Sequence, residues 1–225
     1  MKNLTRQAFL GLVQLIVLLA IFLFLPGWSF NYWQAWVFLL VFTVSVFLIT
    51  LYFLRKDPNL IQSRLKAGPA AEQEKSQKII QAAASLFFIL PFITSSIDHR
   101  LGWSKVPTWI VLLGDVLVGL GLYIVFLVFR ENTFTSATIE VRDEQKVISN
   151  GPYAVIRHPM YSGAFLMLLG IPLALGSWWA LIFVLLLFAA IVWRLLEEEK
   201  FLSKNLPGYT SYRQKVRYRL IPFIW

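Results

Sequence analysis

The sequence predicts an all-α, polytopic membrane protein with five to six transmembrane helical segments, the last two forming a tight helical hairpin. Of the 225 residues, 58% are hydrophobic and only 15% are charged, which is far from the balance of a soluble domain. The apolar residues form runs of about twenty, the length with which a helix crosses a hydrocarbon core of roughly 30 Å. Lysine and arginine are concentrated in alternate connections between these runs.

The distribution of basic residues predicts the orientation in the membrane. Nineteen of the 21 Lys and Arg residues lie before the first run, in the connections 55–78 and 130–157, or after residue 193, whereas only Arg100 and Lys105 lie on the other side. Because cytoplasmic loops are enriched in Lys and Arg, both termini and the large loops are predicted to be cytoplasmic, in a bacterial inner (plasma) membrane. We interpret the net charge of +9 as topology and attraction to membrane lipids, and we expect no nucleic-acid partner.

The apolar runs 7–25 and 33–54 predict the first helical hairpin. Its connection carries four aromatic residues that we expect to form a belt at the membrane interface: Trp28, Tyr32, Trp33 and Trp36. After the second run, Asp57 is a candidate N-cap and Pro58 suits a first helical turn. We therefore predict a short helix along the membrane surface at this point.

The runs 79–97 and 107–129 predict a second hairpin, whose outer connection contains His99, interpreted as a plain surface residue. Asp115 lies in the outer half of the second of these runs. Because an unpaired charge is expensive in a bilayer, we expect Asp115 to be protonated or hydrogen-bonded and structural. Three nearby glycines predict close helix packing: Gly114, Gly119 and Gly121.

The remaining residues predict a different kind of region. The connection 130–157 favours two short strands, 133–141 and 146–149, around the turn residues 142–145. The charge-free run 159–193 would form roughly 50 Å of helix, which is too long for one crossing, and Pro172 and the pair Gly176-Ser177 predict a break. We expect one integrated membrane domain, with N-terminal transmembrane hairpins at 1–130 and a C-terminal catalytic region, with its loop, helical hairpin and tail, at 131–225.

Composition excludes several kinds of site. The chain has no cysteine, so disulfides, thiolate metal sites and a thiol nucleophile are excluded. It has two histidines, His99 and His158, which leave little material for a nitrogen-ligand metal centre. No metal is predicted.

Polar and turn-forming residues gather in the stretch GPYAVIRHPMYSG, residues 151–163, where a charged connection gives way to the last apolar run. Pro159 suits a first helical turn and disfavours the α conformation at His158, so Arg157 and His158 are predicted just before a helix N-terminus. Unpaired N–H groups there favour an anion, and an arginine adds a bidentate clamp for a carboxylate or phosphate. The alternative is an interfacial turn with an arginine that reaches to the headgroups.

A second polar cluster, Glu197 to Glu199, follows the last apolar run. The spacing of Arg194 with Glu198 and of Glu197 with Lys200 would also suit an ion-paired, solvated helix face. Three adjacent acids on a membrane surface otherwise rich in Lys and Arg favour a ligand-binding role.

In combination, these stretches resemble the isoprenylcysteine carboxyl methyltransferase family and its phospholipid methyltransferase relatives. The shared pattern is G-P-Y-x-x-x-R-H-P-x-Y-x-G, a hydrophobic hairpin, E-E-x-x-L and a Y-x-x-Y tail. Here it is filled from 151 to 163, by Glu198, Glu199 and Leu202, and by Tyr209 and Tyr212. The resemblance covers roughly the C-terminal hundred residues, from near Asn132.

The resemblance implies a membrane methyltransferase that uses S-adenosylmethionine and a lipophilic acceptor entering from the bilayer. It places the carboxylate of the cofactor at Arg157 and its ammonium and ribose hydroxyls at Glu198 and Glu199. The predicted catalytic residues are Arg157, His158 and Glu198. The predicted cofactor contacts are Tyr153, Arg157, His158, Pro159, Tyr161, Gly163, Glu198 and Glu199.

The acceptor is expected to be the carboxylate of an isoprenylcysteine-like or other lipid-linked acid, because transfer to a carboxylate needs positioning more than a base. A phospholipid or small-amine N-methyltransferase is an alternative, in which His158 or a glutamate would serve as base. An NADPH-dependent sterol-type reductase is another, although such enzymes resemble R-H-P-N-Y-x-G-E and this chain has Met160 and Ala164 at the two diagnostic positions. A non-catalytic lipid-binding membrane protein is the last alternative.

Overall fold

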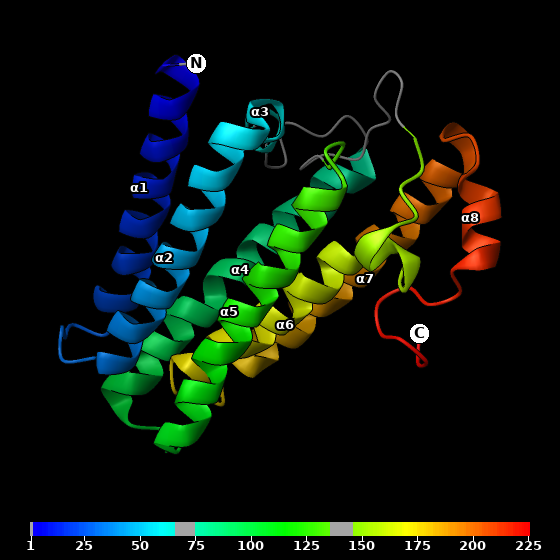
Figure 1. Cartoon of the computed structure of the whole chain (residues 1–225). Coiled ribbons are helices and arrows are strands. Elements are labelled where there is room, and N and C mark those ends of the chain that lie inside the picture. Colours follow the sequence, from blue (N-terminus) through cyan, green and yellow to red (C-terminus); the bar gives the residue numbers. More distant parts are fainter. Residues whose placement is uncertain (1, 66–74, 136–145) are drawn as a thin grey trace.

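Four long helices form the body of the protein in the computed structural model, which describes residues 2–65, 75–135 and 146–225. They are α1 (Lys2–Phe24), α2 (Trp33–Lys56), α4 (Lys75–Leu101) and α5 (Thr108–Glu131). Each is long and apolar enough to cross a membrane, which confirms the four predicted spans. Helix α1 contacts α2, but α4 packs chiefly on α7 (Leu181–Asn205) and α5 packs chiefly on α6 (Pro159–Ala174), so the pairing of α4 with α5 as a second hairpin stays a prediction. The chain is an integral membrane protein, and its helices run side by side in Figure 1.

The short helix α3 (Pro58–Leu65) follows α2 directly. Asp57 caps it as predicted, because its Oδ1 accepts a hydrogen bond from the N–H of Leu60 at 3.1 Å. The side chain of Leu60 is buried in a cluster with Phe53 of α2 and Phe129 of α5. The helix is therefore fixed to the bundle by its apolar side, not only laid on the membrane surface.

The last apolar run forms α6 (Pro159–Ala174) and the first half of α7 (Leu181–Asn205). The chain turns at 175–180, where Gly176 has a φ of +70°. The predicted break at Gly176-Ser177 is confirmed, whereas Pro172 lies inside α6 and does not end it. With 16 residues, α6 measures about 24 Å at about 1.5 Å per residue, so it is shorter than the four spanning helices.

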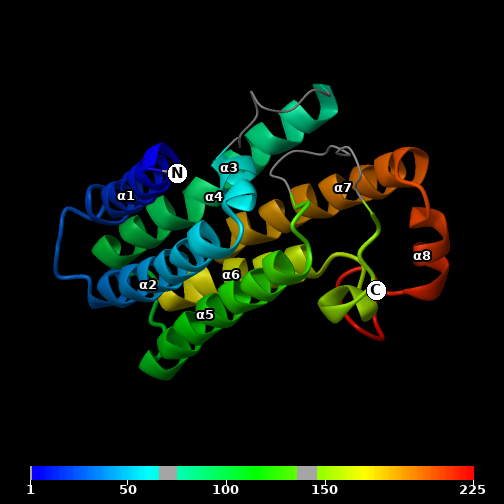
Figure 2. The same cartoon turned by 45° about the horizontal axis from the view of Figure 1, so that its top comes forward.

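The expected tight hairpin between the last two apolar arms is wrong in one respect. Helix α6 packs chiefly on α5, and α7 packs chiefly on α4, as Figures 1 and 2 show from two directions. The two arms share a short turn but bury their apolar faces against different neighbours. Each arm thereby completes the core of the four-helix body.

Glycines decide the contact between α5 and α6. A Cβ on Gly121 would lie 2.5 Å from the carbonyl oxygen of Gly163, and a Cβ on Gly114 would overlap the backbone of Ala174. Gly170 lies equally close to Gly114. The predicted close packing is therefore confirmed for Gly114 and Gly121. Small residues that let backbones approach are typical of helix pairs in membranes, but Gly119 has only the side chain of Val41 nearby, at 4.0 Å.

The register of this contact sets the depth at which α6 begins. Gly121 faces Gly163, and α5 continues for ten residues beyond Gly121, to Glu131. At about 1.5 Å per residue, the first turn of α6 therefore lies on the order of 10–15 Å below the end of α5. The residues just before α6 are recessed to the level of the membrane interface.

The connections α1–α2, α4–α5 and α6–α7 lie at the end of the bundle opposite the start of α6, and we call this end the turn end. It contains buried polar residues that the sequence did not indicate. Tyr32 is buried, and its hydroxyl donates to the carbonyl oxygen of Leu175 at 2.6 Å, so it is not part of an exposed aromatic belt. His99 is not a plain surface residue, because its ring stacks on Tyr32 with centroids 4.0 Å apart and contacts the carbonyl oxygen of Asn31. Asp98 is fully buried and bonded to Ser104 and Ser177.

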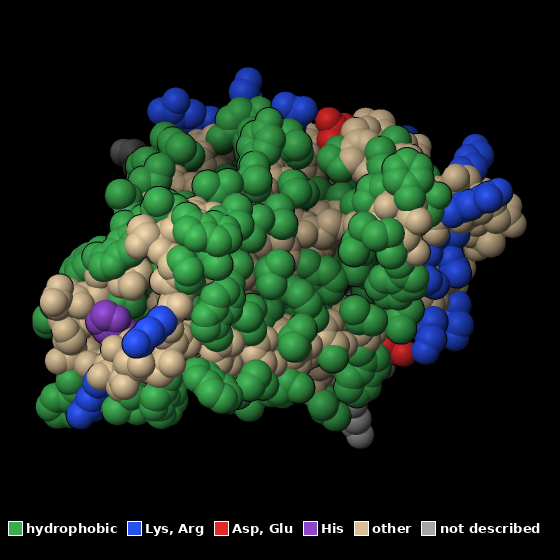
Figure 3. All heavy atoms as spheres, turned by 90° about the horizontal axis from the view of Figure 1, so that it is seen from below, with side chains coloured by type: hydrophobic (Ala, Val, Ile, Leu, Met, Phe, Trp, Pro, Cys, Tyr) green, Lys and Arg blue, Asp and Glu red, His purple; other side chains and the backbone are tan. Residues whose placement is uncertain are grey.

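The predicted strands between α5 and α6 are not found in the residues that are described. Residues 133–135 and 146–149 are irregular, and the rest of the proposed hairpin lies outside the described residues. A short 3₁₀ helix, η2 (Gly151–Ala154), and the helix α8 (Tyr209–Lys215) complete the C-terminal part. Seen from below in Figure 3, hydrophobic side chains cover most of the turn-end face, and many of the basic side chains lie at its edges.

Candidate active site

A parallel pairing of two distant segments shapes the stretch before α6. Ile156 and Tyr218 form an isolated β-bridge, and the N–H groups of Arg157 and His158 donate to the carbonyl oxygens of Tyr218 and Arg219 at 2.9 and 3.0 Å. Pro159 then opens α6 at its first position, where a missing N–H costs nothing. The segment 216–220 thus holds Arg157 and His158 in place before the helix starts.

Arg157 and Glu199 form a buried ion pair, with Nε of Arg157 donating to Oε1 of Glu199 at 2.6 Å. Nη1 of Arg157 also donates to the carbonyl oxygens of Val216 and Arg217 at 2.9 and 2.8 Å. On the other side, Arg219 donates to Oε2 of Glu199 at 3.0 Å. We call these side chains, together with His158 at 3.3 Å from Oε1, the site cluster.

The electrostatics of the site cluster keep Glu199 ionised. Burial raises the pKa of this carboxyl, but hydrogen bonds from His158, Arg157 and Arg219 outweigh it and lower the pKa to about 2. A buried charge persists only when it is paired and hydrogen-bonded. Glu199 is 3% exposed and its two oxygens are occupied by these three partners. Its direct role is therefore to fix Arg157, His158 and Arg219 relative to α7.

Glu198 has a different environment from its neighbour. Its Oε2 accepts a hydrogen bond from the hydroxyl of Tyr161 in α6 at 2.7 Å, and the carboxylate lines a cavity. One turn earlier on α7, Arg194 lines the same cavity and donates to the buried Gln77 of α4 at 3.1 Å. Helix α7 therefore presents both an anion and a cation to this space.

Tyrosines build the wall opposite α6. The hydroxyl of Tyr212 donates to the carbonyl oxygen of Tyr153 at 2.7 Å, and Nδ2 of Asn132 donates to the hydroxyl of Tyr153 at 3.0 Å. Burial raises the pKa of Tyr153 to about 12, against a lowering effect of its bond with Asn132. Burial likewise raises the pKa of Tyr209, helped by the charges of Glu199 and Glu198. Both phenols therefore stay neutral, so each hydroxyl keeps its proton available for donation to a ligand.

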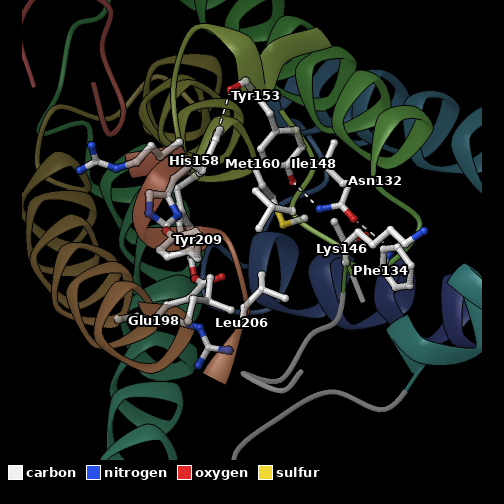
Figure 4. Close-up of a pocket in the computed structure, with 17 residues that line it drawn as sticks. Asn132, Phe134, Lys146, Ile148, Tyr153, His158, Met160, Glu198, Leu206 and Tyr209 are labelled. Carbon is white, nitrogen blue, oxygen red and sulfur yellow. Dashed lines mark hydrogen bonds between the residues drawn. The ribbon is translucent and has the colours of Figure 1, made fainter. Parts of the chain in front are cut away.

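The cavity lies between the start of α6, the middle of α7, α8 and the connection after α5. Figure 4 shows Glu198, His158 and Tyr209 on one side and Asn132, Phe134 and Lys146 on the other. The remaining lining residues are Thr135, Val147, Ile148, Tyr153, Arg157, Met160, Tyr161, Arg194, Leu202, Leu206 and Tyr212. Within the described residues, the buried hydroxyls of Thr135 and Tyr209 have no hydrogen-bond partner. Because buried polar atoms are normally paired, these two hydroxyls fit a cavity that receives a polar ligand.

A cation from the N-terminal half also approaches this region. The guanidinium carbon of Arg64, on α3, lies 5.0 Å from the ring centroid of Phe129. Its pKa is lowered, first by burial, while Tyr161 raises it and Arg194 lowers it further. Ser63, beside it, donates to the carbonyl oxygen of Thr135 at 3.3 Å. Helix α3 therefore adds positive charge close to the cavity wall.

The predicted site residues divide into two groups. Tyr153, Arg157, His158, Tyr161 and Glu198 line the cavity. The other three lie behind it in the described structure: Pro159 begins α6, Gly163 packs on Gly121 of α5, and Glu199 pairs with Arg157.

Sequence reasoning missed several residues that line or support the cavity. Tyr209 was recognised only as part of the Y-x-x-Y pattern, and that pattern was the available signal. The orphaned hydroxyl of Thr135 and the approach of Arg64 had no signal in the sequence. Among the described residues, no group of three His, Cys, Asp or Glu side chains could hold a metal ion.

One known protein family is similar to the region that contains the site. Residues 109–207 match the model of the phospholipid methyltransferase family, PEMT, and no curated protein sequence matches the chain. The matched segment extends from α5 to the end of α7, so it contains both Arg157 and Glu199. It begins earlier than the resemblance near Asn132 suggested, and it ends before Tyr209 and Tyr212.

Residues 109–207 of this integral membrane protein therefore resemble a phospholipid methyltransferase domain of the PEMT type. Proteins of this family use S-adenosylmethionine as the methyl donor. The match favours methyl transfer over the reductase and the non-catalytic alternatives that the sequence left open. It does not extend to an activity specific to isoprenylcysteine.

Proposed function

We propose that this protein transfers a methyl group from S-adenosylmethionine to the polar headgroup of a membrane lipid, with a phospholipid amine as the first candidate acceptor. The observation that carries the proposal is the cavity of Figure 4, which is recessed beside α5 and α6 and combines Glu198 with several cations. A water-soluble donor and a lipid-soluble acceptor can both reach such a place. The family match moves the phospholipid amine ahead of the lipid-linked carboxylate that the motifs first favoured.

The residues of the cavity suit the methyl donor. The carboxylate of Glu198 would receive a cationic or hydroxyl-bearing part of the cofactor. The hydroxyls of Tyr209 and Thr135 lack partners in the described structure and would be satisfied by its polar groups. When bound, the cofactor supplies an electrophilic methyl group on a sulfonium. The contribution of the protein is then to align the two reactants and to exclude water.

We assign the site cluster a positioning role. Arg157 donates from Nε to Glu199 and from Nη1 to two backbone carbonyl oxygens. Because these donors are already bonded within the protein, Arg157 acts mainly by fixing His158 and the segment 216–220. His158 lines the cavity and contacts Glu199. Three residues behind the cavity support this arrangement. Pro159 starts α6, Gly163 lets α6 pack closely on α5, and Glu199 neutralises the charge of Arg157.

The acceptor is proposed from the charges around the cavity. Arg194, Lys146 and Arg64 lie on or near its walls, and cations suit the phosphate of a phospholipid. The amine of such a headgroup must lose a proton before it attacks, and His158 or Glu198 would accept it. The same cations would also hold the carboxylate of a lipid-linked acid, such as an isoprenylcysteine, which is the second candidate and requires no base.

Methyl incorporation from labelled S-adenosylmethionine tests the proposal in vesicles. Vesicles containing phosphatidylethanolamine are compared with vesicles in which a farnesylcysteine acceptor replaces it. We expect label in the phospholipid; label only in farnesylcysteine would select the second candidate. Absence of transfer to lipid extracts and of binding to S-adenosylhomocysteine would refute the function.

Two adjacent glutamates provide a matched pair of variants. We expect Glu198→Gln to weaken binding of S-adenosylhomocysteine by about tenfold or more, the loss typical of a charge-assisted hydrogen bond. Glu197 pairs with the exposed Lys200 at 2.7 Å, so Glu197→Gln should bind normally. Equal binding by both variants would contradict the placement of the cofactor beside Glu198.

We further propose that the cavity faces the cytoplasm, from the distribution of Lys and Arg. Reporter fusions after residue 78 and after residue 225 should both report the cytoplasm. An outside signal at either position would reverse the orientation.

A further inference from the structure

We propose that the segment Ile221–Trp225 inserts into the lipid bilayer beside the active site and anchors the site cluster to the membrane. This surface lies outside the segment matched to the methyltransferase family, which ends at residue 207. The sequence alone treated these residues as part of a basic, cytoplasmic tail.

The apolar side chains of this segment face outward. Ile221, Phe223 and Ile224 are 50%, 85% and 76% exposed, whereas Leu220 directly before them is 3% exposed. A contiguous set of exposed large apolar residues marks a surface that contacts a partner or a membrane.

The depth of the segment identifies the bilayer as that partner. Ser162 of α6 donates to the carbonyl oxygen of Leu220 at 2.6 Å, so Leu220 lies beside the first turn of α6. That turn directly precedes Gly163, which faces Gly121 of α5, so it lies on the order of 10–15 Å along α5 from its end at Glu131. In Figure 1, the label C accordingly lies below α8, on the side of α6 and α7 that faces away from the four spanning helices. At this depth, exposed isoleucine and phenylalanine side chains meet lipid.

The backbone of the segment presents Phe223 away from the protein. The N–H groups of Leu220 and Ile221 both donate to the carbonyl oxygen of Trp225, at 2.9 and 3.1 Å, which closes a small loop. Phe223 lies at its tip with a φ of +66°, a conformation that is unusual for a bulky residue. The loop therefore projects its most exposed side chain outward.

Basic residues next to the loop suit a membrane that contains anionic lipids. Arg213, Lys200 and Arg219 line a groove together with Trp193, which is 50% exposed. Two acids lie in the same groove, Glu197 paired with Lys200 and Glu199 paired with Arg219, so the cations of this groove exceed its acids by one, Arg213. The guanidinium carbon of Arg219 lies 5.2 Å from the ring centroid of Trp225. Tryptophan and basic side chains at headgroup level, beside deeper apolar ones, are the usual pattern of interfacial anchoring.

The anchor is continuous with the site cluster. The residues just before it bind Arg157 through the carbonyl oxygens of Val216 and Arg217 and bind Glu199 through the side chain of Arg219. Insertion of 221–225 would hold this segment against the start of α6. The inference concerns membrane contact, so it stands or falls separately from the methyl acceptor.

The absence of native cysteine allows a direct measurement of depth. Phe223→Cys and, as a matched control, Gln214→Cys on the exposed side of α8 are labelled with a small fluorophore and reconstituted in vesicles containing phosphatidylglycerol. Quenching by a nitroxide on the lipid acyl chain is compared with quenching by aqueous iodide. We expect severalfold stronger lipid quenching at position 223 than at 214, and the reverse for iodide.

Two outcomes would overturn the proposal. Similar quenching of both labels by iodide would place position 223 in water. Protection of position 223 from both quenchers would mean that protein, such as a second copy of this chain, covers the segment. The readout needs neither cofactor nor acceptor, so a failure of the proposed function would leave it interpretable.

Discussion

The protein holds a buried polar cluster at each end of its helices, and the two clusters differ in what they leave unpaired. At the turn end, Oδ1 of Asp98 accepts from the N–H of Ser104 at 2.7 Å, and Oδ2 accepts from the hydroxyls of Ser104 and Ser177 at 2.6 and 2.5 Å. At the other end, the site cluster adjoins a cavity into which Glu198 and the unpartnered hydroxyl of Tyr209 project. Both carboxylate oxygens of Asp98 are hydrogen-bonded within the protein. The cavity beside the site cluster, in contrast, retains polar groups that could bind a ligand.

The comparison separates a structural polar cluster from a functional one. Both are buried and both join segments far apart in the sequence. The bonds of Asp98 tie the turn between α6 and α7 to the end of α4, which fixes the helices. The site cluster uses similar bonds to hold one rim of the cavity, and we propose that the groups on that rim bind the substrates. Changes at each end should therefore have different consequences for stability and for binding.

The largest effect is expected from Arg157→Ala. Removing Arg157 leaves Glu199 with Arg219 and His158 as partners and takes the donor away from the carbonyl oxygens of Val216 and Arg217. Breaking a buried ion pair costs up to about 3–5 kcal/mol. We expect a large fall in thermal stability in detergent and loss of S-adenosylhomocysteine binding. Arg157→Lys is the control that retains the charge. A variant Arg157→Ala with unchanged stability would show that the pair does not organise the site.

Asp98→Asn tests the cluster at the turn end. Hydrogen bonds to a charged group contribute about 1.5–3 kcal/mol, so thermal stability should fall by an amount of that order. S-adenosylhomocysteine affinity, measured where the variant is folded, should not change. A fall in affinity at full stability would contradict the separation between the two clusters.

Gly121→Leu should weaken the contact that sets the depth of the site. Its side chain would meet the backbone of Gly163 and Met167, and overpacking of this kind costs about 1–3 kcal/mol. Gly119→Leu is the matched control, because its nearest neighbour is the side chain of Val41 at 4.0 Å. The melting temperature of Gly121→Leu should be lower than that of Gly119→Leu. Equal melting temperatures would refute the register of α5 and α6.

The smallest mutational effect is expected from Tyr209→Phe. Its hydroxyl lacks a partner in the described structure, so its removal should leave stability unchanged but weaken cofactor binding by about 0.5–1.5 kcal/mol. Tyr212→Phe removes the bond to the carbonyl oxygen of Tyr153 and should lower stability instead. Binding isotherms and melting curves for the pair check this difference.

The pH dependence of the site cluster follows from Glu199. Its pKa in the folded protein, about 2, is below the usual 4.5, so ionisation of this group stabilises the fold above pH 4.5. The contribution is lost as the pH falls from 4.5 towards 2. Melting temperature should therefore decline over this window, and the decline attributable to Glu199 should be absent in Glu199→Gln.

Much of the fold could be predicted from local pattern. The four spanning helices follow from the length of the apolar runs, and α3 follows from Asp57 and Pro58. Pro172 was misjudged because a proline near the end of a helix can be accommodated when its neighbours satisfy the freed backbone groups. The partners of α6 and α7 could not be predicted, since an apolar helix face does not indicate which other face will cover it.

The candidate site was predicted only in part, because local patterns are visible in a sequence and contacts between distant segments are not. Arg157, His158, Tyr161 and Glu198 line the cavity, and the sequence pointed to them because a turn-forming, polar stretch and three acids stand out from an apolar sequence. The loop of Ile221–Trp225 and the carbonyl oxygens that hold Arg157 had no such signal, because backbone groups look alike in every sequence. Arg64 gave none either, since α3 is far from the motifs along the chain.

The sequence by itself determined that this is a membrane protein and where its four long helices lie. These properties depend on hydrophobicity and on the spacing of neighbouring residues, whereas the methyltransferase site was inferred from the resemblance of the motifs to a known family. Only the tertiary structure decided that Glu199 pairs with Arg157, 42 residues away, while Glu198 faces the cavity. Adjacent residues on a helix point in different directions. The packing of distant segments decides which of the two side chains meets a partner and which faces a cavity.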